Sequence, residues 1–168
     1  MTKPAKAVNP NHIFVDTNVL IGGYSGDPRF QKDAACLHYL YSLNGKKLYI
    51  STLSVAQLIS VYSEGRNPRD YRVSRGGYQK TNDEIRRIVR ELRHRFNVID
   101  FTARDIDEAL NETGADIEED DGEHQSSVQY VLAMKQKCRI IITNNYKDYR
   151  LLMWIEATTP EKVKIITK

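Results

Sequence analysis

Cysteine is scarce in this 168-residue sequence, and no hydrophobic run approaches the ~18 residues that span a membrane. Two cysteines, Cys36 and Cys138, cannot form a disulfide framework, so we expect reduced, buried thiols. The four histidines lack the close ligand spacing of a zinc site. The first ten residues have no apolar centre, unlike a secretory signal, which predicts a short flexible arm (residues 1–11) on a cytoplasmic protein without membrane contact.

Charge, by contrast, is plentiful and unevenly distributed. Residues 66–95 contain ten basic and four acidic side chains, whereas residues 100–123 contain eleven acidic side chains and one arginine. A basic stretch attracts polyanions, but charged stretches also cover solvated helix faces, and both interpretations stay open. In the basic stretch an arginine recurs every third residue, which makes these the best candidates for contacts with RNA phosphates: Arg66, Arg69, Arg72 and Arg75. Tyr78 could stack on a base there, although a core or surface role is preferred.

Short apolar runs alternate with amphipathic segments along the chain. Strands are predicted at residues 12–15, 47–51, 97–101, 139–143 and 163–167. Helices are predicted between Asp27-Pro28 and Asn44-Gly45, at 52–62, after a capping box at 81–84, and at 103–112 and 123–136. Because most of the strands are apolar throughout and alternate with helices, we expect a parallel sheet covered on both faces. The sequence thus predicts a single three-layer α/β/α domain over residues 12–168, with a basic insertion at about residues 65–80.

Polar residues follow three of the predicted strands. Asp16 comes after the first strand, residues 51–54 (STLS) end the second, and Thr143 with two asparagines ends the strand at 139–143. In an open parallel sheet, ligands bind outside the carboxyl ends of the strands, so we expect these side chains to converge. Carboxylate and neutral oxygens of this kind suit Mg²⁺ or Mn²⁺. The alternative for Asp16 is that it only caps the helix that follows.

Two other nucleotide-related classes are disfavoured by the residues around the first strand. Ile21-Gly22-Gly23 is not the glycine pattern that binds a dinucleotide phosphate after a first strand. A phosphatase of the Asp-x-Asp class needs a second acid two residues after Asp16, where this sequence has Asn18.

Four segments in one order resemble the PIN-domain family. Residues 13–21 (IFVDTNVLI) resemble its opening strand, which ends in a metal-binding Asp followed by Thr-Asn, and residues 51–54 resemble its second motif. Residues 129–149 resemble its closing helix, strand and loop, and residues 159–161 (TPE) resemble a group of bacterial members. The resemblance spans most of the chain from residue 12 and implies a PIN-like (Rossmann-like) fold. PIN domains are typically metal-dependent ribonucleases, among them the toxins of toxin–antitoxin pairs.

The resemblance implies an acidic site that is only partly present in this chain. Asp16 matches the first metal-binding acid, and Asn18 matches the residue that supports it. The other three acids of the family are replaced at their matched positions, by Gln57, Ser126 and Asn145.

Two acids stand near the vacant positions. Glu123 lies one turn before Ser126 on the same predicted helix, and Asp148 lies three residues after Asn145. With both, the site reaches three negative charges; with Asp16 alone it has one. The predicted catalytic and metal-binding residues are therefore Asp16, Glu123 and Asp148, supported by Asn18, Gln57, Ser126, Thr143 and Asn145. For Gln57, a hydrogen-bonded buried amide is preferred over a ligand role.

Two functions follow from these observations. The first is a Mg²⁺- or Mn²⁺-dependent endoribonuclease of PIN type that cleaves RNA phosphodiester bonds. The alternative is a catalytically impaired PIN-like module that binds nucleic acid or another protein. An antitoxin-like protein is a candidate partner, a homodimer is left open, and the sequence gives no RNA target.

Overall fold

The computed structural model describes residues 8–68, 78–113, 123–145 and 155–167, with backbone only for residues 112, 113, 123–127 and 166. The strands are β1 (Asn9–Val15), β2 (Lys47–Ser51), β3 (Asn97–Ile99), β4 (Cys138–Ile142) and β5 (Glu156–Thr158). The α-helices are α1 (Thr17–Tyr24), α2 (Gln31–Ser42), α3 (Thr52–Glu64), α4 (Asn82–Arg95), α5 (Ala103–Thr113), α6 (Glu123–Lys135) and α7 (Val163–Ile166). Within the described ranges, the short 3₁₀ helices η1 (Pro28–Phe30) and η3 (Pro160–Lys162) lead into α2 and α7.

The five strands form one parallel sheet in the order β3-β2-β1-β4-β5. The central strand β1 pairs with β2 and β4, so that Phe14 lies between Tyr49 and Ile141. All strands run in the same direction, so the carboxyl ends of β1, β2 and β4 lie side by side at one edge. This confirms the three-layer α/β/α prediction and its parallel sheet.

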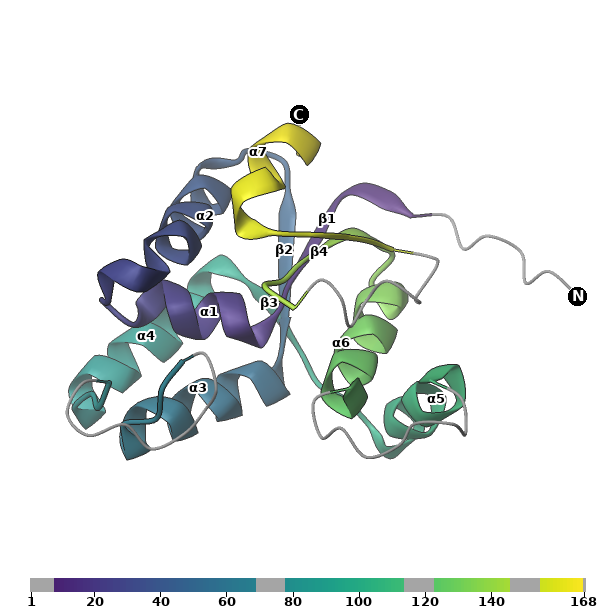
Figure 1. The fold of residues 1–168 in the computed structure, drawn as a ribbon. Helices are drawn as coiled ribbons and strands as arrows, with labels where there is room; N and C mark the ends of the chain where they lie inside the picture. The colour runs from purple at the N-terminus through teal and green to yellow at the C-terminus, as the bar shows by residue number, and fades with distance from the viewer. Residues whose placement is uncertain (1–7, 69–77, 114–122, 146–154, 168) are drawn as a thin grey trace, which may run out of the picture.

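Apolar side chains on both faces of the sheet form two separate cores. Alternate residues of a strand point to opposite faces, so Ile13 and Val15 join one buried cluster and Phe14 joins the other. The first cluster packs against α1–α4, and the second against α6. Figure 1 shows α1, α2, α3, α4 and α7 on one side of the sheet and α5 and α6 on the other.

Local sequence signals set most of the helix boundaries. Asp16 caps α1, Ser51 caps α3, and Thr81 forms the predicted capping box with Glu84. Gly65 ends α3 with a φ of 68°, a left-handed conformation that glycine adopts without a steric penalty. These motifs act over three or four residues, which is why the sequence reveals them.

The prediction of a strand at residues 163–167 is wrong, because this segment forms the helix α7. Pro160 follows Thr159 and begins η3, a turn that continues directly into α7. Val163 is 1% exposed and Ile165 is 77% exposed, so only part of the apolar run is buried. A short apolar run does not distinguish a strand from a helix. The fifth strand is instead β5, which the sequence analysis missed.

Two further differences lie near the first strand. β1 begins at Asn9, three residues inside the predicted arm, where the backbone N–H of Asn9 donates to Lys137 at 2.8 Å. Helix α1 directly follows Asp16, as the capping alternative for Asp16 implied, although no bounds were predicted for it. Cys36 and Cys138 are free and buried as expected, and burial raises the pKa of each thiol to about 12. Among the helices of the described ranges, none is long and apolar enough to cross a bilayer.

Candidate active site at the carboxyl edge of the sheet

Asp16 lies immediately after β1, and its side chain is nearly buried at 6% exposure. Its backbone N–H donates to the carbonyl of Ile142 at the end of β4, at 2.9 Å. Carboxylate Oδ1 accepts the N–H of Thr17 at 2.7 Å, which caps α1. Oδ2 accepts from the Thr143 hydroxyl at 2.7 Å and from the Asn18 amide at 3.0 Å. Asp16 therefore caps a helix and also joins the ends of two neighbouring strands.

Asparagine side chains extend this arrangement from β4 to the helices α1 and α2. The amide oxygen of Asn18 accepts the backbone N–H of Asn144 at 3.0 Å. The side-chain amide of Asn144 donates to Asp33 of α2 at 2.9 Å, and the Asp33 side chain is 1% exposed. The N–H of Asn145 donates to the Thr143 hydroxyl at 3.0 Å. The structure thus brings Asp16, Asn18, Thr143 and both asparagines of the loop after β4 together, as expected from their places at the strand ends, and it adds Asp33.

A buried cluster of hydroxyl and amide groups lies beside Asp16. The Thr17 and Ser54 hydroxyls are 2.7 Å apart, and Ser51 is 3.0 Å from Ser54. The amide nitrogen of Gln129, on α6, donates to both Thr17 and Ser54, at 3.0 and 2.9 Å. The sequence analysis gave no role to Thr17 or Gln129; the only signal was a polar residue within the apolar pattern of α6. This cluster ties α6 to the ends of β1 and β2.

Two side-chain amide oxygens are buried without a hydrogen-bond partner among the described residues, that of Gln129 in this cluster and that of Gln57. Gln57 lies one turn after Ser54 on α3. The preferred interpretation of Gln57 as a satisfied amide is therefore wrong for its oxygen. A buried acceptor without a donor costs about 1–3 kcal/mol, so such an atom is where a bound water or cation is expected.

The predicted trio of acids is only partly described. The side chains of Glu123 and Ser126 lie outside what the structure describes, although both residues are in the first turn of α6. Asp148 also lies outside the described residues. Within the described ranges, no three His, Cys, Asp or Glu side chains are grouped closely enough to hold a metal ion. The metal-binding role of the trio therefore stays a prediction.

A pocket of about 280 Å³ opens next to Asn18. Its lining combines three amide side chains of the strand edge with two basic residues of η1 and α2: Asn18, Asn144, Asn145, Arg29 and Lys32. Phe30 contributes an aromatic ring. Asp33 and Pro68 also line it. The pocket therefore adjoins the hydrogen-bonded group that holds Asp16.

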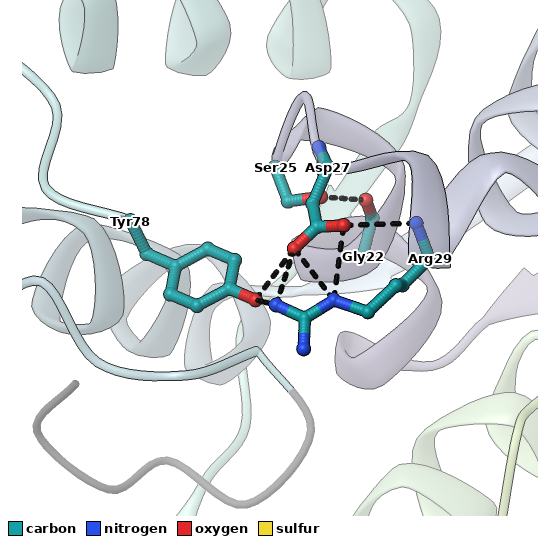
Figure 2. A network of polar contacts seen from close by, with 5 residues as sticks. All are labelled: Gly22, Ser25, Asp27, Arg29 and Tyr78. Carbon is teal, nitrogen blue, oxygen red and sulfur yellow. Dashed lines mark hydrogen bonds and ion pairs between the residues drawn. The ribbon is translucent and has the colours of Figure 1, made fainter. Parts of the chain in front are cut away.

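The basic side of this pocket is held by a polar network (Figure 2). Asp27 accepts from the guanidinium of Arg29 through Nε at 3.0 and 3.1 Å and through Nη2 at 2.7 Å. The Tyr78 hydroxyl donates to Asp27 at 2.7 Å and accepts from Arg29. The Arg29 hydrogen bond, followed by that of Tyr78, holds the pKa of the Asp27 carboxyl well below its usual range. Tyr78 is 5% exposed, which confirms the preferred core role over base stacking.

Most of the arginines predicted to contact RNA are not among the residues that the structure describes. Arg69, Arg72 and Arg75 lie outside the described residues. Arg66 is described, and its Nε donates to Glu64 at 2.6 Å. Contact between these arginines and phosphates stays a prediction.

Comparisons with known proteins agree with this architecture. The family model of the PIN domain matches residues 13–150. A structure of VapBC2 from Rickettsia felis bound to a DNA fragment from the promoter is 16% identical, with a TM-score of 0.57 over 88% of this chain and 98% of that chain. VapBC-1 from nontypeable Haemophilus influenzae is 18% identical, with a TM-score of 0.57 over 90% and 99% of the two chains.

A third similar structure is VapC20 of Mycobacterium tuberculosis, described as a toxin that cleaves the sarcin-ricin loop. It is 15% identical, with a TM-score of 0.52 over 77% of this chain and 86% of that chain. No curated protein sequence matches the chain significantly. At these identities the structural likeness establishes the fold, and the family model establishes the family.

Proposed function

The chain belongs to the PIN domain family, and we propose that it is a Mg²⁺- or Mn²⁺-dependent endoribonuclease that hydrolyses RNA phosphodiester bonds. One observation carries the proposal: the Asp16 carboxylate is held at the carboxyl edge of the sheet by Asn18 and Thr143, from two different strand ends. Ligand sites of parallel sheets lie at this edge. The long-range bond from Thr143 and the local bond from Asn18 orient a charged oxygen at the edge where RNA is proposed to approach.

The donor types at this edge fit a hard divalent ion. Asp16 supplies a carboxylate, and the buried amide oxygens of Gln57 and Gln129 supply neutral oxygens. Mg²⁺ and Mn²⁺ prefer such ligands, and affinity increases with the number of charged ones. Glu123 and Asp148 are the proposed additional carboxylates. When bound, the ion supplies polarisation of the scissile phosphate and an activated water.

The chain's own residues prepare this site in two ways. Thr143 and Asn18 fix the orientation of the Asp16 carboxylate, so no rotation is needed when a ligand arrives. The bonds from Gln129 to Thr17 and Ser54 hold α6 against the strand ends. Gln129 is therefore a fixed point of α6, and the first turn of the helix, which contains Glu123, lies one to two turns before it.

Recognition of RNA is assigned to the basic insertion. Pro68, the residue before the undescribed segment 69–77, lines the pocket, and Tyr78, the residue after it, contacts Arg29. Of the two residues that flank the segment, one lines the pocket and the other contacts a residue that lines it. Arginines of this segment, Arg69, Arg72 and Arg75, together with Arg66, are proposed to contact backbone phosphates.

A protein partner of antitoxin type is also proposed. Two of the similar structures are described as VapBC assemblies. On α5, Ile106 is 40% exposed and Leu110 is 51% exposed, one turn apart on the same helix. Exposed apolar side chains at this spacing suit the burial of a partner helix or of a second copy of this chain. The RNA target is proposed to be cytoplasmic.

A second candidate is a PIN-like module that binds RNA or a protein without cleaving it. The neutral side chains of Gln57 and Asn145 at two family acid positions favour it, because each removes one negative charge from the site.

Cleavage of a mixed single-stranded RNA with Mn²⁺ tests the proposal. Asp16→Asn should abolish cleavage, whereas Asp83→Asn, the same change at a fully solvated carboxylate on α4, should not. Thermal unfolding of each variant checks that it is folded. If the wild type binds RNA with a steep salt dependence but does not cut it, the second candidate is correct. If it neither cuts nor binds RNA at low salt, a protein-interaction role remains.

A further inference from the structure

We propose that the pocket beside Asn18 binds one unpaired nucleotide of the RNA, with Arg29 holding its phosphate. This inference rests on the proposed RNA substrate, but it does not depend on cleavage. It assigns a substrate subsite to Arg29 of η1 and Lys32 of α2, which matched no family motif, together with the loop after β4.

The guanidinium of Arg29 is oriented before any ligand arrives. Its Nε and Nη2 groups donate to Asp27, and Nη2 also donates to the buried Tyr78 hydroxyl. In Figure 2 the remaining terminal nitrogen, Nη1, points away from these partners. A guanidinium has five N–H donors, so an N–H pair on Nη1 is available for a phosphate. Because the side chain is already fixed, binding costs little further rotamer entropy.

The cations of the pocket are closer to solvent than its carboxylates. The Arg29 side chain is 68% exposed and its partner Asp27 is 17% exposed. Lys32 is 50% exposed, whereas Asp33 is buried. A phosphate entering from solvent therefore meets Arg29 and Lys32 before Asp27 and Asp33, and it competes for Lys32 with Glu161, which is 51% exposed. The exposed ion pair of Lys32 with Glu161 is of the weak kind, so Lys32 can turn to the phosphate at small cost.

The opposite wall of the pocket offers hydrogen bonds to a base. The Asn144 amide nitrogen is bound to Asp33, which leaves its oxygen without a hydrogen bond to any described residue. The side chain of Asn145 likewise has no hydrogen-bond partner within the described ranges. Amide groups read the edges of unpaired bases, which splay out of the strand. Asn18, which contacts Asp16, lies in the same wall, so the nucleotide would sit next to the candidate active site.

The size of the pocket selects against paired RNA. Its volume of about 280 Å³ lies just below the ~300–1,000 Å³ range of ligand sites. This suits a single nucleotide, whereas a base pair within a stacked duplex cannot enter. We therefore expect a preference for single-stranded over duplex RNA.

Fluorescence anisotropy with a labelled short single-stranded RNA tests the inference. The measurements use the Asp16→Asn protein in EDTA, so that no cleavage intervenes. Arg29→Gln should weaken binding by about tenfold, as expected for the loss of a hydrogen bond to a charged group. Arg139→Gln is the matched control, because Arg139 is an exposed arginine near the opposite end of β4. It should leave the affinity within about twofold of the Asp16→Asn protein.

Competition identifies the bound group. AMP should displace the labelled RNA, whereas adenosine, which lacks the phosphate, should not. In the Arg29→Gln protein, AMP and adenosine should compete equally weakly. Equal affinities of Arg29→Gln and Arg139→Gln would overturn the inference, as would equal binding of duplex and single strand. If Arg29→Gln does not fold, Lys32→Gln decides in the same way. If Arg29→Gln weakens RNA binding but the wild type does not cleave RNA, the nucleotide subsite is supported and the proposed nuclease activity is rejected.

Discussion

Replacement of Gly22 by alanine tests how the contact between α1 and α2 supports the site. An added Cβ would lie 2.1 Å from Oδ2 and 3.0 Å from Cγ of Asp33, so one of the helices or the carboxylate must move. Overpacking of a core costs about 1–3 kcal/mol. Alanine in a helix gains up to about 1 kcal/mol over glycine, which offsets part of this cost. We expect the free energy of unfolding to fall by about 1–2 kcal/mol.

Thermal and urea unfolding measure this loss, which corresponds to about 2–8 °C in Tm for a chain of this size. Because Asp33 accepts from Asn144, the displaced carboxylate should also loosen the loop after β4 and weaken RNA binding. Gly45→Ala, in the turn after α2, is the control: its φ of 75° adds backbone strain, but no atom lies within 4 Å of the new Cβ. It should destabilise the fold without changing RNA binding. A Gly22→Ala protein as stable as the wild type would refute the close-contact argument.

Two more changes test the electrostatics. Gln57→Glu places an acid where the buried amide oxygen lies. Without metal, the free energy of unfolding should fall by about 1–3 kcal/mol. Mn²⁺ should raise the Tm of this variant more than that of the exposed control Gln31→Glu, and equal shifts would argue against a metal nearby. Burial alone would raise the pKa of Asp105, but hydrogen bonds from Lys135 and Thr102 outweigh it and lower that pKa. The group therefore stabilises the fold at neutral pH, and this contribution is lost as the pH falls below about 4. Urea unfolding at pH 7 and near pH 3 should show a larger loss for the wild type than for Asp105→Asn; parallel losses would contradict this sign.

The candidate site was partly predictable because its motif residues follow strands that are apolar throughout. Asp16, Asn18, Thr143 and Asn145 were predicted to converge, and the structure brings them within hydrogen-bond distance of one another. Gln129 was missed, because a single polar residue in an apolar helix gives no sign of its partners.

The sequence by itself determined the parts of the local structure that depend on neighbouring residues, but not the helical form of residues 163–166. The capping box at Thr81, the cap at Asp16 and the glycine at the end of α3 are contacts within a few residues, so their residue types suffice to predict them. Tertiary structure decided which distant groups meet. Gly22 belongs to a glycine pair that does not fit a dinucleotide-binding motif, and in the structure it packs closely against Asp33 on α2. The pairing of Asp16 with Thr143 spans 127 positions and depends on the register of β1 with β4, a property of the packed sheet that no short segment encodes.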